Sequence, residues 1–278
     1  MIIAAAVCPW PPVLARDLTG LDPVIPALRD ACGLAAERLV RSAPELVAVI
    51  GPAAATGAWD PAARLDLSVF APGLSAPGPF APGLSAPGPA SIADPALPPS
   101  LGLGAMLLDR AGYTGRRLLQ AVSEAEPPDG CADLGAAMAA SATRVGLLAM
   151  ADGSARRCER APGQFDDRAA AFDAETERAL REGNLEALLA IDAGLARELM
   201  ATGRPALQVL AGAIGPARSA TEILFSGAPF GVSYLVAFVS ADPLREGVAG
   251  RSELGHRVLG VDQGIEDIAR HRLPQDLP

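Results

Sequence analysis

Several side chains that could do chemistry lie in one polar segment after the apolar run 145–150. This segment contains Asp152, Ser154, Arg156 and Arg157. Arginine beside carboxylates binds small anions through paired hydrogen bonds, and it equally neutralises buried acids without any ligand. Asp152 could also do no more than cap the turn into the next helix. Asp152 and Arg156 are therefore candidate catalytic residues, Ser154 and Arg157 are candidate ligand-binding residues, and structural pairing is the alternative.

A second segment of interest, Cys8-Pro9-Trp10-Pro11-Pro12, follows the apolar run 1–7. A buried strand that ends in a rigid loop often presents catalytic or metal-binding residues. A histidine between these prolines would suggest a metal ligand, but Trp10 stands there. A tryptophan buries a large apolar area. We therefore expect Trp10 to contact any ligand at this strand end and to make the pocket smaller.

The third catalytic candidate is Glu222, an acidic residue within a late apolar run. Two carboxyl groups in different environments can act as acid and base, so Asp152 and Glu222 could serve a metal-independent lyase or hydrolase. We expect an α/β fold to bring these candidates together in one cluster. Its expected members are Trp10, Asp152, Ser154, Arg156, Arg157, Glu159 and Glu222.

The elements that must position these residues alternate between strands and helices. Apolar runs at 1–7, 46–50 and 145–150 predict buried strands, and apolar spacing predicts an amphipathic helix over 24–41. This strand-helix-strand start favours an α/β layer with parallel strands. Further helices are predicted at 98–122, 132–142, 166–183, 185–200 and 206–214, an exposed strand at 65–70, and a hairpin of strands at 221–225 and 232–239.

The predicted fold class is thus a three-layer α/β domain over residues 1–240, with a central, mostly parallel or mixed sheet flanked by helices. A ten-residue unit at 70–79 recurs unchanged at 80–89, and its proline and glycine content predicts a surface loop over 70–98. Residues 241–278 read as a polar C-terminal tail.

Composition narrows the function. The formal charge of −9 argues against nucleic acid and anionic membranes as partners. The absence of lysine excludes a catalytic Schiff-base lysine. No apolar run is long enough to span a membrane. The cysteines are Cys8, Cys32, Cys131 and Cys158, and their wide spacing predicts free thiols in a cytoplasmic protein rather than a zinc site.

Several segments, in this order, resemble the class III extradiol ring-cleavage dioxygenase superfamily, in particular a small actinobacterial branch. They are Val7-Cys8-Pro9-Trp10-Pro11-Pro12, the strand end at Gly51-Pro52, Gly153-Ser154-Ala155-Arg156-Arg157, Ala161-Pro162-Gly163, Thr202-Gly203-Arg204-Pro205 and Ala228-Pro229-Phe230-Gly231-Val232-Ser233-Tyr234. The order of these segments carries the resemblance, which spans residues 1–240. It implies the fold of the family's catalytic chain, with a central mostly parallel sheet.

The resemblance also implies a chemistry that this chain matches only in part. Active members of the family cleave catechol-type rings with O₂ at a non-haem Fe(II) held by two histidines and one carboxylate, with a further histidine as acid/base. Here Trp10 stands at the first ligand position, Pro52 and the two alanines after it at the second, and Arg156 or Arg157 at the acid/base position. Only Glu222 matches the carboxylate.

These departures lead to two hypotheses. The first is a family member with a degenerate iron site and no cofactor, which is non-catalytic or repurposed to bind a small anionic or aromatic ligand. The alternative is an active Fe(II) enzyme with an atypical ligand set of Glu222, His256 and His271, the last two being the only histidines of the chain. Apolar helices and the late hairpin at a sheet edge favour a homodimer in either case.

Overall fold

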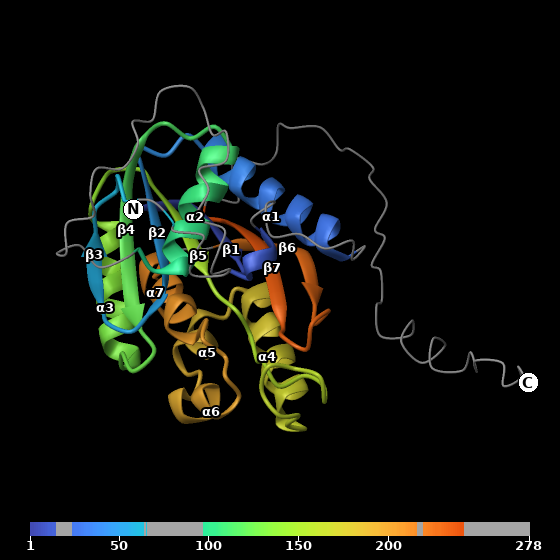
Figure 1. Cartoon of the computed structure of the whole chain (residues 1–278). Helices are drawn as coiled ribbons and strands as arrows, with labels where there is room; N and C mark the ends of the chain where they lie inside the picture. Colours follow the sequence, from blue (N-terminus) through green and yellow to red (C-terminus); the bar gives the residue numbers. More distant parts are fainter. Residues whose placement is uncertain (15–23, 64, 66–96, 216–218, 242–278) are drawn as a thin grey trace, which may run out of the picture. The chain divides into compact units, whose positions relative to one another are not determined.

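The structure, a computed structural model, describes residues 1–14, 24–63, 65, 97–215 and 219–241 (Figure 1). All of these belong to one compact unit, Met1–Pro243; a second unit, Leu244–Pro278, lies outside the described residues. Residues 66–96 also lie outside the described residues. They include most of the expected strand at 65–70 and most of the expected repeat loop at 70–98. The expected tail from residue 242, His256 and His271 also lie outside the described residues.

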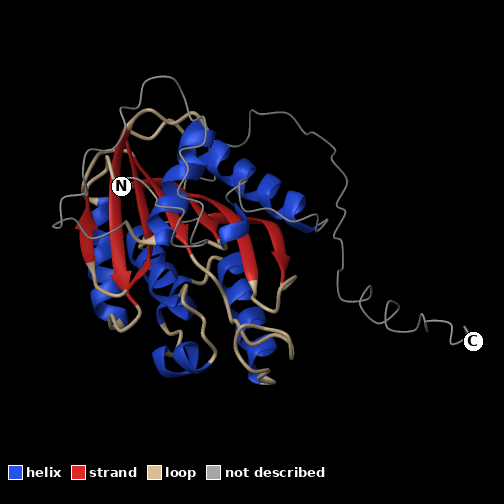
Figure 2. Cartoon of the chain, in the orientation of Figure 1, coloured by secondary structure: helices blue, strands red, loops and turns tan. Residues whose placement is uncertain are grey.

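One mixed sheet, whose strands are red in Figure 2, organises this unit. It has seven strands in the order β3-β4-β2-β5-β1-β7-β6. The four strands from β4 to β1 are parallel, and β3, β7 and β6 are antiparallel to their neighbours. The strands are β1 (Ile2–Cys8), β2 (Leu46–Ala53), β3 (Gly57–Trp59), β4 (Arg116–Ser123), β5 (Val145–Met150), β6 (Ala220–Gly227) and β7 (Tyr234–Ser240).

Helices cover both faces of the sheet (Figure 1), which confirms the expected three-layer α/β fold class. Helices α1 and α2 pack on one face, and α3, α4, α5 and α7 share an apolar cluster on the other. The helices are η1 (Pro12–Leu14), α1 (Val24–Arg41), α2 (Pro99–Arg110), α3 (Pro128–Ala139), α4 (Arg168–Glu182), α5 (Leu185–Leu189), α6 (Ala193–Glu198) and α7 (Arg204–Ile214). No helix in the described ranges is long and apolar enough to cross a membrane.

The parallel strands are buried on both faces because helices lie above and below them. Successive residues of β1 alternate between the two layers: Ala4, Ala6 and Cys8 face the α1–α2 side, while Ala5 and Val7 face α7. The small side chains of this strand let the helices approach closely. The sheet can therefore form from a chain that is rich in alanine and poor in aromatic residues.

Two of the expected helices are wrong in extent. The helix expected over 98–122 ends at Arg110, and Leu118 and Leu119 belong to strand β4 instead of a helix face. Gly112 follows the C-cap residue Ala111 and has a φ of 75°, a conformation that favours glycine and stops the helix. The helix expected over 185–200 is divided into α5 and α6, because the Asp192 carboxylate accepts from the Leu195 N–H and starts a new helix.

Candidate functional site

The carboxyl ends of the three central strands meet at one edge of the sheet. Strand β5 pairs with β2 on one side and with β1 on the other, so the loops that follow these strands are neighbours. The Ala151 N–H donates to the carbonyl of Cys8, the last residue of β1, over 2.8 Å, which continues the pairing one residue beyond β5. We call this region, with Trp10, Asp152, Arg156 and Thr202, the strand-end site.

Asp152 lies at the centre of the strand-end site. Its carboxylate accepts a hydrogen bond from the Trp10 main-chain N–H over 2.9 Å, and its carbonyl accepts from the Gly203 N–H over 2.9 Å. It also forms an isolated antiparallel bridge with Tyr234 at the start of β7. Burial raises the pKa of Asp152 to about 7, and the hydrogen bond from Trp10 only partly offsets this effect. This carboxyl can therefore gain or lose a proton near neutral pH.

Two titratable groups near Asp152, the Tyr234 hydroxyl and the Cys32 thiol, keep their protons at neutral pH. Tyr234 is buried, and burial together with the nearby Asp152 raises the pKa of its hydroxyl. The thiol of Cys32, from α1, interacts with that of Cys8 at the end of β1; this interaction and burial raise the Cys32 pKa. All of the expected free cysteines are free; Cys8, Cys32 and Cys131 are buried, and Cys158 is exposed.

Ser154 and Arg157, which we expected to bind a ligand, contact other parts of the protein. The buried Ser154 hydroxyl donates to the Leu199 carbonyl over 2.8 Å, and the Ser154 N–H donates to Asp173 over 2.9 Å. Arg157 donates to the other oxygen of Asp173 over 3.1 Å. Burial raises the pKa of Asp173, and the bonds from Ser154 and Arg157 oppose this effect. Asp173 thus fastens the loop after β5 to helix α4.

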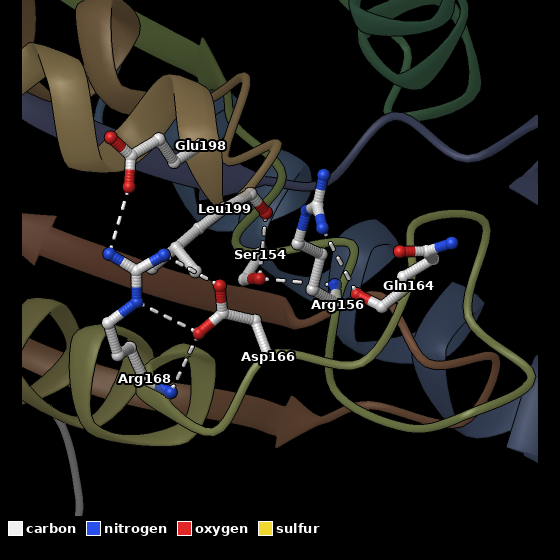
Figure 3. Close-up of polar contacts among 7 residues, drawn as sticks. All are labelled: Ser154, Arg156, Gln164, Asp166, Arg168, Glu198 and Leu199. Atoms are coloured by element: carbon white, nitrogen blue, oxygen red, sulfur yellow. Dashed lines mark hydrogen bonds and ion pairs between the residues drawn. The ribbon is translucent and has the colours of Figure 1, made fainter.

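A further polar network holds the rest of this loop (Figure 3). Arg168 donates to both oxygens of Asp166 and to Glu198 of α6. These hydrogen bonds from Arg168 lower the pKa of Asp166 to about 2. Arg156 is placed differently: its guanidinium points away from Asp166 in Figure 3 and donates one long bond of 3.4 Å to the Gln164 carbonyl.

Three buried side-chain atoms have no hydrogen-bond partner within the described protein, and all three belong to the strand-end site. They are Trp10 Nε1, Arg156 Nε and Thr202 Oγ1. A buried donor without a partner costs about 1–3 kcal/mol, so such atoms are rare in folded proteins. Trp10 and Arg156 were among the sequence candidates. Thr202 was not, although its place just before Gly203-Arg204-Pro205 marks a helix start.

Glu222 does not join the strand-end site. It pairs with Phe238 in the β6–β7 ladder, four residues along β7 from Tyr234, or about 13 Å. Its carboxylate instead forms an ion pair with Arg38 of α1, and the Glu222 side chain is 60% exposed. Glu159 is exposed on the loop after β5. The arrangement therefore gives Asp152 and Glu222 no common site for acid/base work.

No group of three metal-ligating side chains occurs within the part of the chain that the structure describes. His256 and His271, the histidine ligands of the alternative hypothesis, lie outside that part. A shallow depression of about 300 Å³ lies between α4, α5 and α6, and its lining includes none of the strand-end residues.

Comparisons with known proteins add little to this description. No protein-family model matches the chain, and no curated protein matches it. Among solved structures, the chain is similar to the crystal structure of the uncharacterized protein JW3007 from Escherichia coli K12. The two share 14% sequence identity over 86% of this chain and 99% of the other, with a TM-score of 0.47.

Proposed function

We propose that this protein binds a small molecule at the strand-end site, on a frame related to the class III extradiol dioxygenase superfamily whose iron site is degenerate. The observation that carries the proposal is the adjacency of β2, β5 and β1 in the sheet. The positions that hold the family's histidines come at the carboxyl ends of these strands, where this chain has Trp10 and Arg156 on the loops after β1 and β5 and Pro52 as the penultimate residue of β2.

The chemistry of these residues does not fit Fe(II). An iron site of that type needs imidazole and carboxylate ligands. An indole N–H only donates hydrogen bonds, an arginine side chain is a permanent cation, and proline offers no side-chain ligand. Asp152 is a carboxyl at this edge, but its oxygen already accepts from the Trp10 N–H. We therefore derive no step through iron.

The same residues are well suited to hold a ligand without a metal. The loop after β5 is fixed to α4 and α6 through Asp173, Ser154 and Leu199. A rigid support keeps binding groups in position and lowers the entropy cost of binding. The buried donors of Trp10, Arg156 and Thr202 supply polar contacts that the protein itself does not satisfy.

Metal analysis of protein purified without a tag, loaded anaerobically with Fe(II) and then desalted, tests this proposal. We expect far less than one iron per chain, and no oxygen uptake with catechol above that of a buffer control. One equivalent of iron that is lost in both His256→Ala and His271→Ala, together with oxygen uptake, would overturn the proposal. That result would favour the Fe(II) enzyme with Glu222, His256 and His271 as ligands.

A further inference from the structure

We infer that Trp10, Arg156 and Thr202 form a binding site for a small oxyanion such as a carboxylate. This inference rests on the proposed function and deepens it by naming the chemistry of the ligand. Its basis is that the three buried atoms without a partner lie on chain segments that meet around Asp152. The Asp152 carboxylate accepts from the Trp10 N–H, and the Asp152 carbonyl accepts from the N–H of Gly203, the residue after Thr202. Arg156 follows Asp152 on the same loop.

The hydrogen-bonding capacity of these atoms defines the complementary ligand. The Trp10 indole and the Arg156 guanidinium can only donate, and the Thr202 hydroxyl can donate as well. A ligand that satisfies all three must offer several acceptor oxygens. An oxyanion does so, and the charge of Arg156 strengthens the bonds it receives.

Two neighbouring features favour a negative charge at this position. Helix α7 begins two residues after Thr202, and the N-terminal end of a helix stabilises anions. Arg156 makes no ion pair within the described residues, whereas the nearby Arg157 and Arg168 each pair with an aspartate. The Arg156 guanidinium makes one long bond to the Gln164 carbonyl and keeps its Nε–H without a partner, so it retains donors and charge for a ligand.

The setting of Trp10 indicates the rest of the ligand. The Trp10 side chain packs against the apolar cluster between the sheet and helices α1 and α2. A ligand that accepts a hydrogen bond from the Trp10 indole N–H therefore lies next to the edge of the indole ring and to apolar side chains. An aromatic carboxylate such as benzoate fits this setting, and inorganic phosphate tests the oxyanion requirement alone.

The chain offers an internal control for a binding experiment, because it contains two tryptophans, Trp10 and Trp59. Trp59 lies in the edge strand β3. In protein labelled with ¹⁵N at the indole nitrogens, an NMR spectrum shows one signal for each, and Trp10→Phe assigns them. On titration with benzoate or phosphate, we expect a saturable shift of the Trp10 signal and none of the Trp59 signal. Benzamide, which has the same ring but no charge, should shift neither signal.

Variants then test the remaining two donors. Arg156→Gln and Thr202→Val should each weaken benzoate binding about tenfold, as expected when one charge-assisted hydrogen bond is lost. Arg160→Gln removes the same charge from an exposed position of the same loop and should leave binding unchanged. Unfolding midpoints show whether the variants remain folded, and the titration of the wild-type protein does not depend on them.

Three outcomes would overturn the inference. The first is no saturable Trp10 shift with either anion up to about 10 mM, ten times the dissociation constant of a weak millimolar site. The second is an equal response to benzamide, and the third is an equal loss of affinity in Arg160→Gln. These outcomes can be told apart from the iron measurement. If the protein binds no iron and also fails this titration, the proposal of a degenerate iron site stands and the oxyanion site is ruled out.

Discussion

The carboxylate of Asp152 accepts a hydrogen bond from the main-chain N–H of Trp10 over 2.9 Å, and so joins the loops after β5 and β1. The two residues are far apart in sequence, but β1 and β5 are neighbours in the sheet. The main chain at Trp10 is thus held by a carboxyl whose pKa is raised to about 7. The geometry of the strand-end site is linked to protonation near neutral pH.

Replacing Asp152 by asparagine should change how stability depends on pH. Burial raises the folded-state pKa of Asp152 from 3.8 to about 7, so between these values the folded protein binds more protons than the unfolded chain. This contribution to the free energy of unfolding is fully present below pH 3.8 and is lost as pH rises through 7. The asparagine side chain has no charge to bury, and its amide oxygen can still accept from Trp10.

We therefore expect Asp152→Asn to match the wild type near pH 4 and to exceed it in stability at pH 8 by about 2 kcal/mol, with a ceiling of about 4 kcal/mol set by the pKa difference. Urea unfolding of both proteins at several pH values measures the difference. Two parallel curves, with a constant gap from pH 4 to pH 8, would show that Asp152 has an ordinary pKa.

Much of the fold follows from local sequence patterns, because the central strands are short apolar runs and α1 has strong helical periodicity. The expected strands at 1–7, 46–50 and 145–150, the helix over 24–41 and the late hairpin all lie within a few residues of the observed elements. Strand β4 could not be recognised in this way. Its central residues are buried on both sides, so Leu118 and Leu119 lack the alternation of a half-buried strand and fit a helix equally well.

The candidate site was harder to predict, because it depends on long-range register. Sequence placed Asp152, Trp10 and Arg156 at strand ends, and the structure brings their segments to one edge. It could not show that Glu222 pairs with Phe238, since the register of a hairpin depends on its turn and on packing. The sequence also offered no sign that Asp173, which lies in a charged helix, is buried beneath the loop after β5.

This buried position leads to a prediction for Asp173. Replacing it by alanine leaves Arg157 and the Ser154 N–H without their acceptor, so we expect a loss of about 3 kcal/mol in the free energy of unfolding. Glu222→Ala is the matched control, because it breaks the ion pair with Arg38 in a side chain that is 60% exposed. Exposed pairs contribute about 0–1 kcal/mol. Equal losses in the two variants, measured by urea unfolding, would contradict the structural role of Asp173.

The contact between α3 and α7 gives a second stability prediction. A Cβ added at Gly135 of α3 would overlap the Val209 carbonyl oxygen and lie 2.6 Å from the Ala213 nitrogen, both main-chain atoms of α7. A main chain cannot move aside as a flexible side chain can, so the two helices must separate. Gly135→Ala should therefore cost about 3 kcal/mol, well above the usual effect of a surface substitution.

The matched control for Gly135 is Gly33, which also lies within a helix, α1. A Cβ added at Gly33 meets nothing within 4 Å. Alanine has the higher helix propensity, so Gly33→Ala should raise the free energy of unfolding by about 0.5–1 kcal/mol. The two variants carry the same chemical change, and only the neighbouring helix distinguishes them. If urea unfolding gives Gly135→Ala the same small gain, the backbones of α3 and α7 are not in close contact, and the packing beneath β5 and the strand-end site must differ from that described.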